Sequence, residues 1–439
     1  EIYRFENGMD HKDGKLLWNV DRLFGEILNG MKKCKELGKI PVSMAIDTWA
    51  VDYVLLDEQD RILGDTYGYR DHRTDGMDAE VAKILPETEL YGKTGIQKQI
   101  FNTVYQLMAV QQQTPELLQQ AKTLLMLPDY FGFRLTGNKL SEYTNGSTTQ
   151  LVNPDTFQWD KELIRKLGYP EDIFLPLQMP GTKVGQLLPE IQEEVGFDLE
   201  VVLCGSHDTA SAVMAVPQTE GDGIYISSGT WSLMGIESLK PIINEEAAVA
   251  NFTNEGGYDH RFRFLKNIMG LWMIQSVRHE YNDTYSFAQL CDMAEESKEF
   301  PSRVDVNDQS FLSPDSMVEA IRQYCHKTGQ PVPESVGELT SVVYRSLAQS
   351  YGETVSGLEK IAGKTYDSIH IIGGGSNAAY LNQLTADATG KTVYAGPGEA
   401  TAIGNLLAQM IHAGDLADLK SARKCVRESF EIKTFAPAK

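Results

Sequence analysis

Buried-type strands alternate with helices in both halves of the chain, and this alternation limits the fold more than any other feature of the sequence. In the first half, "PVSMAID" (41–47) and "LEVVLC" (199–204) have the apolar character of buried strands, and residues 21–37 carry helically spaced apolar side chains. In the second half, "SIHII" (368–372) and "TVYAG" (392–396) each precede a helical segment. Such alternation is typical of α/β layers, so we predict an α/β protein.

The length predicts two domains, because 439 residues exceed what one hydrophobic core usually serves. The polar, turn-rich stretch "VPQTEGDG" (216–223) marks a boundary. We therefore predict an N-terminal domain over residues 1–214 and a C-terminal domain over residues 215–439. We also predict that "EIYRFE" (1–6) is a strand that starts at the first residue.

The acidic composition excludes some partners. The net charge of −21 and the pI near 4.8 disfavour nucleic acid and anionic membranes, although backbone N–H groups can still hold a phosphate ligand. No apolar run approaches the ~18 residues of a membrane span. The five cysteines are scattered and odd in number, and no cysteine or histidine motif for a metal is present. These features predict a cytoplasmic protein without disulfides and without a protein-ligated metal.

A glycine-rich loop, "GGGSNA" (373–378), follows the strand at 368–372. Its glycines allow close approach of a phosphate, and Gly373, Gly375 and Ala378 also match the dinucleotide pattern G-x-G-x-x-G/A, which makes an NAD-dependent oxidoreductase a competing interpretation. That pattern requires an acidic residue at the end of the next strand, where this sequence has Gly396 and a proline. A turn without any ligand is the third interpretation.

Two further segments have both a structural and a chemical interpretation. "SSGTW" (227–231) is either a plain β-turn or a cradle for phosphate oxygens. In "GSHDTASA" (205–212), Asp208 is either the cap of the following helix or a catalytic base, and these residues alone favour the cap. "IDTWAVD" (46–52) places polar groups at the end of a strand, with Trp49 as a core residue or a platform for a sugar.

Several motifs resemble the FGGY carbohydrate kinases over nearly the whole chain. They occur in the family's order: "IDTWAVDYVLLD", "YRDHRT", "SHDTASAV", "YISSGTWSLMG", "LKNIMGLW", "IIGGGSNAAYLNQL" and "GPGEATAIGN". The resemblance implies two actin/ribonuclease H-like domains with an active-site cleft between them. It also implies transfer of the γ-phosphoryl group of ATP, with Mg²⁺, to the 1-hydroxyl of L-rhamnulose.

The resemblance assigns roles to individual residues. Asp208 falls on the family's catalytic base, which suits the chemistry because a carboxylate at a helix N-terminus stays ionised and can accept the hydroxyl proton. The substrate-binding positions are Ala50, His207, Asp208, Thr209 and Asn267. The ATP-binding positions are Thr230, Gln275 and Gly374.

The sequence departs from the family in two ways. Ala50 stands where the family has a glycine next to the sugar, so a related ketose such as L-fuculose is an alternative substrate. The family also begins with a strand and an Asp-x-Gly phosphate loop that helps to place Mg²⁺, and this sequence starts after them. We therefore expect a leading segment to be missing and the chain as given to bind poorly. A non-catalytic, actin-like sugar-binding module is a further alternative, and the sequence does not indicate an oligomeric state.

Overall fold

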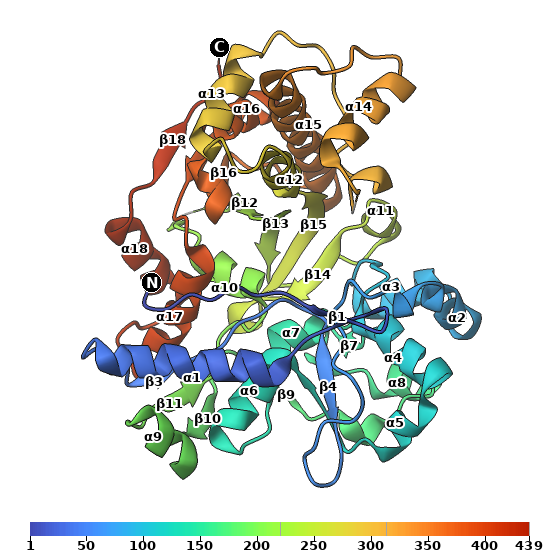
Figure 1. Ribbon diagram of the computed structural model, residues 1–439, viewed down its shortest axis with the longest axis vertical. Coiled ribbons are helices and arrows are strands. Elements are labelled where there is room, and N and C mark those ends of the chain that lie inside the picture. The colour runs from blue at the N-terminus through green and yellow to red at the C-terminus, as the bar shows by residue number, and fades with distance from the viewer. Residues whose placement is uncertain (220, 313, 439) are drawn as a thin grey trace. The chain divides into compact units, whose positions relative to one another are not determined.

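A computed structural model describes residues 1–219, 221–312 and 314–438 (Figure 1). The chain forms two compact units. The first unit consists of Glu1–Ser211, Ser238–Arg263 and Gly404–Leu419, and the second consists of Ala212–Glu237, Phe264–Ile403 and Lys420–Lys439. Each unit therefore combines segments that lie far apart in the sequence.

The first unit is a mixed α/β structure. Its strands are β1 (Asp10–Lys12), β2 (Lys15–Leu17), β3 (Ser43–Met44), β4 (Tyr53–Leu56), β5 (Thr123–Met126), β6 (Ser141–Glu142), β7 (Val152–Asn153), β8 (Gln158–Trp159), β9 (Leu177–Gln178), β10 (Lys183–Gln186), β11 (Glu200–Val202) and β14 (Thr253–Gly256). Its helices are α1 (Val20–Glu36), α2 (Met77–Ile84), α3 (Glu87–Thr94), α4 (Thr103–Gln113), α5 (Pro115–Gln120), α6 (Leu127–Thr136), α7 (Tyr143–Ser147), α8 (Lys161–Lys166), α9 (Pro189–Val195) and α11 (Glu245–Val249).

Helix α1 confirms the prediction over residues 21–37 and shows why the sequence forms it. The side chain of Asn19 accepts a hydrogen bond from the backbone N–H of Arg22 and so caps the first turn. Leu23, Phe24 and Leu28 fall on one face and are buried. The helix therefore covers one side of the first unit's core.

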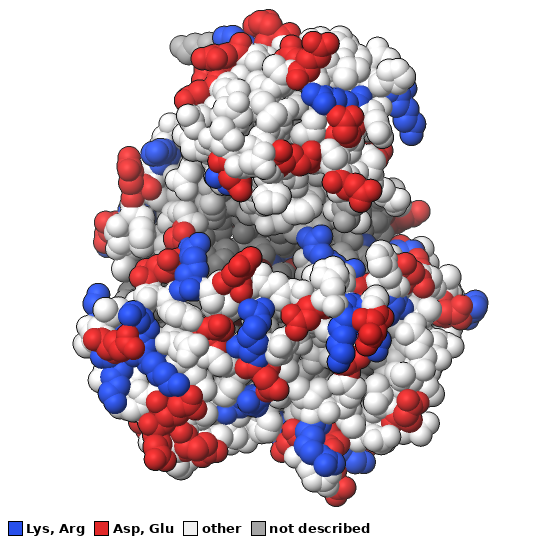
Figure 2. All heavy atoms as spheres, in the orientation of Figure 1, with Lys and Arg blue, Asp and Glu red and all other residues white. Residues whose placement is uncertain are grey.

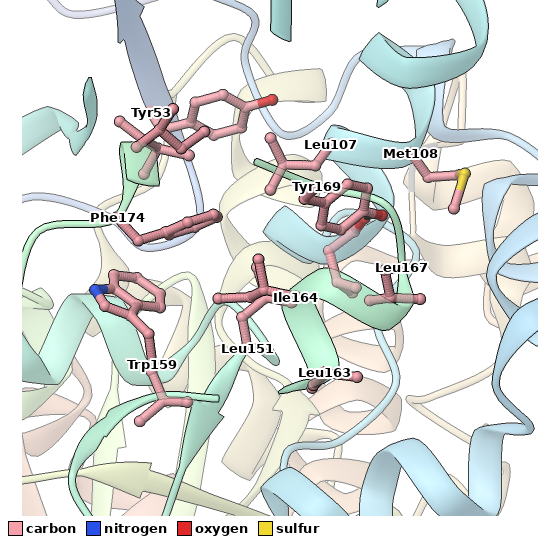
Figure 3. Packing of buried hydrophobic residues seen from close by; sticks show 14 of the residues in the cluster. Tyr53, Leu107, Met108, Leu151, Trp159, Leu163, Ile164, Leu167, Tyr169 and Phe174 are labelled. Atoms are coloured by element: carbon pink, nitrogen blue, oxygen red, sulfur yellow. Dashed lines mark hydrogen bonds between the residues drawn. The ribbon is translucent and has the colours of Figure 1, made fainter. Parts of the chain in front are cut away.

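The antiparallel pair of β4 and β5 separates two apolar clusters of the first unit. Alternate residues of β4 point to opposite sides, so Tyr53 and Leu55 join one cluster while Val54 and Leu56 join the other. Figure 3 shows part of the first cluster, in which Trp159 and Phe174 lie beside the aliphatic side chains of α8. Because both faces are buried, the strand is apolar at every position, as the sequence "YVLL" predicts.

The second unit is built on a sheet. Its strands β12 (Ile224–Ser228), β13 (Trp231–Ser238), β15 (Phe262–Met269), β16 (Ser368–Ile372), β17 (Thr392–Ala395) and β18 (Lys433–Phe435) take the order β15-β13-β12-β16-β17-β18. Its helices are α12 (Trp272–Glu280), α13 (Phe287–Glu296), α14 (Met317–Lys327), α15 (Val336–Ala362), α16 (Ala379–Thr389) and α18 (Leu419–Ser429). A capping box formed by Ser335 and Glu338 starts the long helix α15, which packs against α13 and α16 (Figure 1).

Two helices carry the chain from one unit to the other. Helix α10 (Asp208–Met214) begins in the first unit, and α17 (Ala400–Ala413) begins in the second. The chain also passes between the units within β13, β15 and α18, so every crossing lies inside a helix or a strand and not in a loop. The single division between residues 214 and 215 remains a prediction.

The prediction of a strand over residues 1–6 is wrong. Within the part of the chain that is described, this segment pairs with no other strand, and its residues are mostly exposed. Instead it lies along α1, where the Tyr3 hydroxyl donates to Glu26 at 2.5 Å. The strand predicted over residues 41–47 is also shorter than expected, because only Ser43–Met44 pairs with β11.

The charged surface and the apolar character of the helices bear on the expectations about partners. On the face in Figure 2, acidic and basic side chains are interspersed, and no single basic field dominates it. Within the described ranges, no helix combines the length and apolar character needed to cross a bilayer.

Candidate active site

The loop that carries Asp208 lies against the end of the "IDTW" segment. Strand β11 runs parallel to β3, and the chain continues beyond both strands in the same direction. Thr48 N–H donates to the carbonyl of Ser206, and Asp208 N–H donates to the carbonyl of Thr48, both at 2.9 Å. The two motifs, about 160 residues apart, therefore meet at the carboxyl ends of neighbouring strands, where α/β proteins keep ligands.

Asp208 is the first residue of α10, and its carboxylate is 47% exposed. The backbone carbonyl of His207 accepts from the N–H groups of Ala210 and Ser211, so His207 precedes the helix. The Asp208 Oδ1 atom lies 3.1 Å from the donating Thr209 hydroxyl and 3.4 Å from His207 Nε2. Among the described residues, no backbone N–H donates to this carboxylate. Within those ranges the carboxylate therefore makes no capping hydrogen bond and is accessible to a ligand.

The buried carboxylate of Glu142 anchors the loop before Asp208 through hydrogen bonds. It is fully buried, and it accepts from the N–H and hydroxyl groups of both Thr144 and Ser206 and from the N–H of Asn145. Thr144 in turn accepts from the N–H of His207 at 3.3 Å. Burial raises the pKa of Glu142, against the effect of these hydrogen bonds. Glu142 thus fixes the backbone immediately before Asp208.

Ala50 is followed by a strained residue. Val51 has a φ of 68°, a left-handed conformation that a β-branched side chain rarely adopts. Its carbonyl accepts from the Thr103 hydroxyl at 2.7 Å and from Gln106 at 3.2 Å. These bonds offset a strain that costs about 1–3 kcal/mol, which is a pattern common at functional sites.

Next to Ala50, two tryptophans share one buried carboxylate. The indole N–H groups of Trp18 and Trp49 donate to Asp52 Oδ2 at 2.6 and 2.9 Å, and the rings stack with centroids 4.0 Å apart. Burial raises the pKa of Asp52 to about 6, although these donors and Gln106 lower it. Trp49 is therefore held rigidly and packs partly against the core.

Asp47 lies near Asp208 and is also perturbed. Asn405 donates to its Oδ2 atom at 2.6 Å. Burial raises the pKa of Asp47 to about 7, the bond from Asn405 lowers it, and the charge of Asp208 raises it further. The site therefore holds a second carboxyl group that titrates near neutral pH.

In the second unit, the positions assigned to ATP come together. Strands β12 and β16 are parallel neighbours, so the turn after Ser228 and the triplet that starts at Gly373 lie at the same edge. The carbonyl of Thr230 accepts from Trp272 N–H at 3.1 Å, which ties the turn to the start of α12, where Gln275 lies. The turn, this helix and the triplet form one constellation.

The three glycines of the triplet differ in their surroundings. A Cβ added to Gly375 would lie 2.0 Å from the Ser228 hydroxyl oxygen, and one added to Gly373 would lie 2.9 Å from the Ser228 carbonyl oxygen. A Cβ on Gly374 would meet nothing within 4 Å. Two glycines are therefore required by packing, whereas Gly374 leaves open space beside the backbone that a phosphate can approach.

Asn267 lies on β15, and its Oδ1 atom is buried without a hydrogen-bond partner among the described residues. Such an atom is costly unless a ligand donates to it. Within residues 1–219, 221–312 and 314–438, no group of three or more His, Cys, Asp or Glu side chains is placed to hold a metal ion.

Each unit thus gathers one part of the predicted site. Ala50, His207, Asp208 and Thr209 come together in the first unit. The second unit holds the other predicted residues, namely Thr230, Asn267, Gln275 and Gly374. The roles of these residues stay predictions.

The sequence analysis missed the buried groups that support the site. Glu142 belongs to the polar run at 141–150, which looks like a loop although every residue in it is buried. Its only sequence signal is the absence of Lys and Arg from so polar a stretch. Glu255 and Arg263 were assigned no role from the sequence.

Known proteins resemble this chain over its whole length. A family model described as the N-terminal domain of the FGGY family of carbohydrate kinases matches residues 5–215, and the C-terminal-domain model matches residues 224–413. A rhamnulokinase from Halalkalibacterium halodurans is 53% identical over 438 residues, covering 100% of this chain and 93% of that protein. One from Bacillus subtilis is 46% identical over 440 residues, covering 100% of this chain and 90% of that protein.

Solved structures show the same fold at low identity. A ligand-bound xylulose kinase from Lactobacillus acidophilus has a TM-score of 0.80 at 16% identity, covering 98% of this chain and 87% of that one. Plasmodium falciparum glycerol kinase with ADP has a TM-score of 0.76 at 14% identity, covering 98% and 88%. The predicted fold, α/β with two domains, is confirmed.

Proposed function

Because this chain belongs to the FGGY family of carbohydrate kinases, we propose that it transfers the γ-phosphoryl group of ATP to the 1-hydroxyl of L-rhamnulose. The observation that carries this choice of sugar is the full-length similarity to proteins named rhamnulokinase. We place the enzyme in the cytoplasm, where ATP is available.

Asp208 acts as the general base. Its half-exposed carboxylate accepts the proton of the 1-hydroxyl as the oxygen of that hydroxyl attacks the γ-phosphorus. The bond from this phosphorus to the β–γ bridging oxygen breaks, and ADP leaves with the electron pair. A sugar hydroxyl is a poor nucleophile, so a positioned proton acceptor supports the attack.

The remaining residues bind and orient the two substrates. His207, Thr209, Ala50 and Asn267 contact the sugar, and the buried, unpartnered Oδ1 of Asn267 supports a donor from the ligand. The ATP-binding residues are Thr230, Gln275 and Gly374. When bound with ATP, Mg²⁺ would supply neutralisation of the phosphate charge. The described residues offer no metal cluster of their own, so no step is assigned to Mg²⁺.

A second sugar, L-fuculose, is a candidate because of Ala50. A methyl group stands where the family has a glycine, and the strained Val51 fixes its position. A panel of ketoses assayed with ATP and Mg²⁺ distinguishes the two. A higher kcat/KM for L-fuculose would overturn the assignment of L-rhamnulose.

The test of the mechanism is Asp208→Asn. We expect kcat to fall by roughly 10²-fold or more, because general-base catalysis contributes about 10²–10⁴. Sugar binding, measured by calorimetry, should be largely kept. Asp160→Asn, which alters the carboxylate that caps α8, is the matched control and should keep its kcat. Turnover that survives in Asp208→Asn would show that Asp208 is not the base.

A further inference from the structure

His207 sits against a buried ion pair that the proposed reaction does not use. Glu255 lies on β14 and Arg263 on β15, and their side chains are 7% and 0% exposed. Arg263 Nη2 is 3.1 Å from Glu255 Oε2 and 3.0 Å from His207 Nδ1. Glu255 Oε2 is 3.3 Å from the same ring nitrogen. The histidine therefore faces a cation and an anion at once.

The charges of the pair are settled by their mutual contact. Burial works to raise the pKa of Glu255, but the charge of Arg263 and the contact with His207 outweigh it, so the pKa lies below its usual range. Arg263 is always charged and can only donate hydrogen bonds. Glu255 is consequently ionised and neutralises a guanidinium that is completely buried.

This arrangement determines which ring nitrogen of His207 carries the proton. Arg263 Nη2 and His207 Nδ1 are at hydrogen-bonding distance, and Arg263 supplies the hydrogen, so Nδ1 accepts. Glu255 Oε2 is farther from Nδ1, at 3.3 Å, and meets no hydrogen-bond geometry within the described chain, so Arg263 is the better-placed partner of Nδ1. A neutral ring that accepts at Nδ1 carries its hydrogen on Nε2. That nitrogen lies 3.4 Å from Asp208 Oδ1.

We infer that Arg263, held in place by Glu255, keeps His207 as the Nε2–H tautomer, with its hydrogen on the nitrogen that lies 3.4 Å from Asp208 Oδ1. Arg263 and Glu255 are then positioning residues, because they reach the reacting carboxylate only through His207. The tautomer stands independently of the chemistry, whereas its catalytic consequence rests on the proposed kinase function.

The consequence concerns the two oxygens of Asp208. His207 Nε2 and the Thr209 hydroxyl both approach Oδ1, so Oδ2 remains the oxygen that accepts the proton of the sugar. The opposite tautomer would point a lone pair at Oδ1 and repel the carboxylate. It would also offer Nε2 as a second, misplaced proton acceptor.

The first experiment needs no substrate, and a variant only to assign the signals. Nitrogen-15 chemical shifts of His207, assigned with His207→Gln, report the tautomer directly at neutral pH. We expect a protonated Nε2 and an unprotonated Nδ1. A ring protonated on Nδ1 alone, or on both nitrogens, would overturn the inference even if the protein is an active kinase.

The second experiment removes the donor. In Arg263→Met we expect the Nε2–H signature to be lost and kcat to fall roughly 10²-fold, since the wrong tautomer of a catalytic histidine costs up to about 10⁴ in another enzyme class. KM for ATP should not change. Arg263→Lys keeps a charged donor and should recover part of both losses, which a purely structural role would not produce.

A matched control separates folding from positioning. Arg423 and Glu237 form another largely buried ion pair, in the second unit. Arg423→Met should lose a similar amount of thermal stability but keep its kcat and the tautomer of His207. If Arg263→Met behaves like this control, the positioning role is refuted. If Arg263→Met changes the tautomer of His207 but leaves kcat unchanged, the proposed catalytic consequence of the tautomer is refuted.

Discussion

Glu142→Ala should destabilise the protein and slow it at the same time. The carboxylate accepts from three backbone N–H groups, those of Thr144, Asn145 and Ser206, at 2.7, 3.0 and 3.2 Å. It also accepts from the hydroxyls of Thr144 and Ser206 at 2.6 and 2.5 Å. Alanine would leave all five donors without this partner in a fully buried region.

The size of the effect follows from these donors. Each buried donor left without a partner costs about 1–3 kcal/mol, and the two hydroxyls can rotate toward other acceptors whereas the three N–H groups cannot. Removing a buried charge, whose pKa is raised by burial, returns part of this cost. We therefore expect a loss of roughly 3–5 kcal/mol in the free energy of unfolding. Glu142→Gln keeps the shape but turns one acceptor into a donor, so roughly 1–3 kcal/mol is expected.

The assays are urea denaturation and the rate of ADP formation at a temperature where every variant is folded. Because Ser206 directly precedes His207 and Asp208, kcat should fall in the order wild type, Glu142→Gln, Glu142→Ala. Asp160→Ala removes another carboxylate cap in the first unit and should cost about 1 kcal/mol without changing kcat. Wild-type stability in Glu142→Ala, or a normal kcat in a destabilised but folded variant, would refute the reasoning.

Three further outcomes are expected. The pKa of Asp47 is about 7 in the folded chain and near 4 when unfolded, so the free energy of unfolding should fall as pH rises from about 4 to 7, by at most ~1.4 kcal/mol per pH unit. Asp47→Asn should make this slope shallower in denaturation measured across that range, while Asp52, whose pKa is raised to about 6, keeps its own share. Gly374→Ala should fold normally but raise KM for ATP, whereas Gly375→Ala, which meets Ser228, should lower the melting temperature through a cost of about 1–3 kcal/mol. Ile164→Ala, in the core cluster of Figure 3, should lower the free energy of unfolding by about 2–5 kcal/mol in urea without altering KM.

Much of the fold could be predicted because it depends on local patterns. Helix α1, the Ser-Gly-Thr turn between β12 and β13 and the strand β16 before the glycine triplet all lie where apolar spacing and glycine placed them. The strand predicted at residues 1–6 failed because alternation of side chains does not supply a neighbouring strand. Pairing depends on distant segments, which a local pattern does not contain.

The candidate site could be predicted only where short motifs mark it. Asp208, Thr230 and Gly374 lie in or beside turns with distinctive small and polar residues. Glu142 and Arg263 act from inside the core, where a polar side chain is stable only because distant partners satisfy it. Their partners include residues distant in the sequence, so no spacing pattern in the sequence indicates their role.

The composite first unit also has a consequence for biosynthesis. Residues 404–419 belong to this unit, and Asn405 and Gln409 bond to Asp47 and Ser43. During translation, at about 5–20 residues per second, these partners emerge roughly 10–40 seconds after residue 211. Throughout that interval Asp47 and Ser43 lack these hydrogen bonds. A nascent chain stalled before residue 404 should therefore remain sensitive to protease in the first unit, although residues 404–419 are the only part of that unit still to be made.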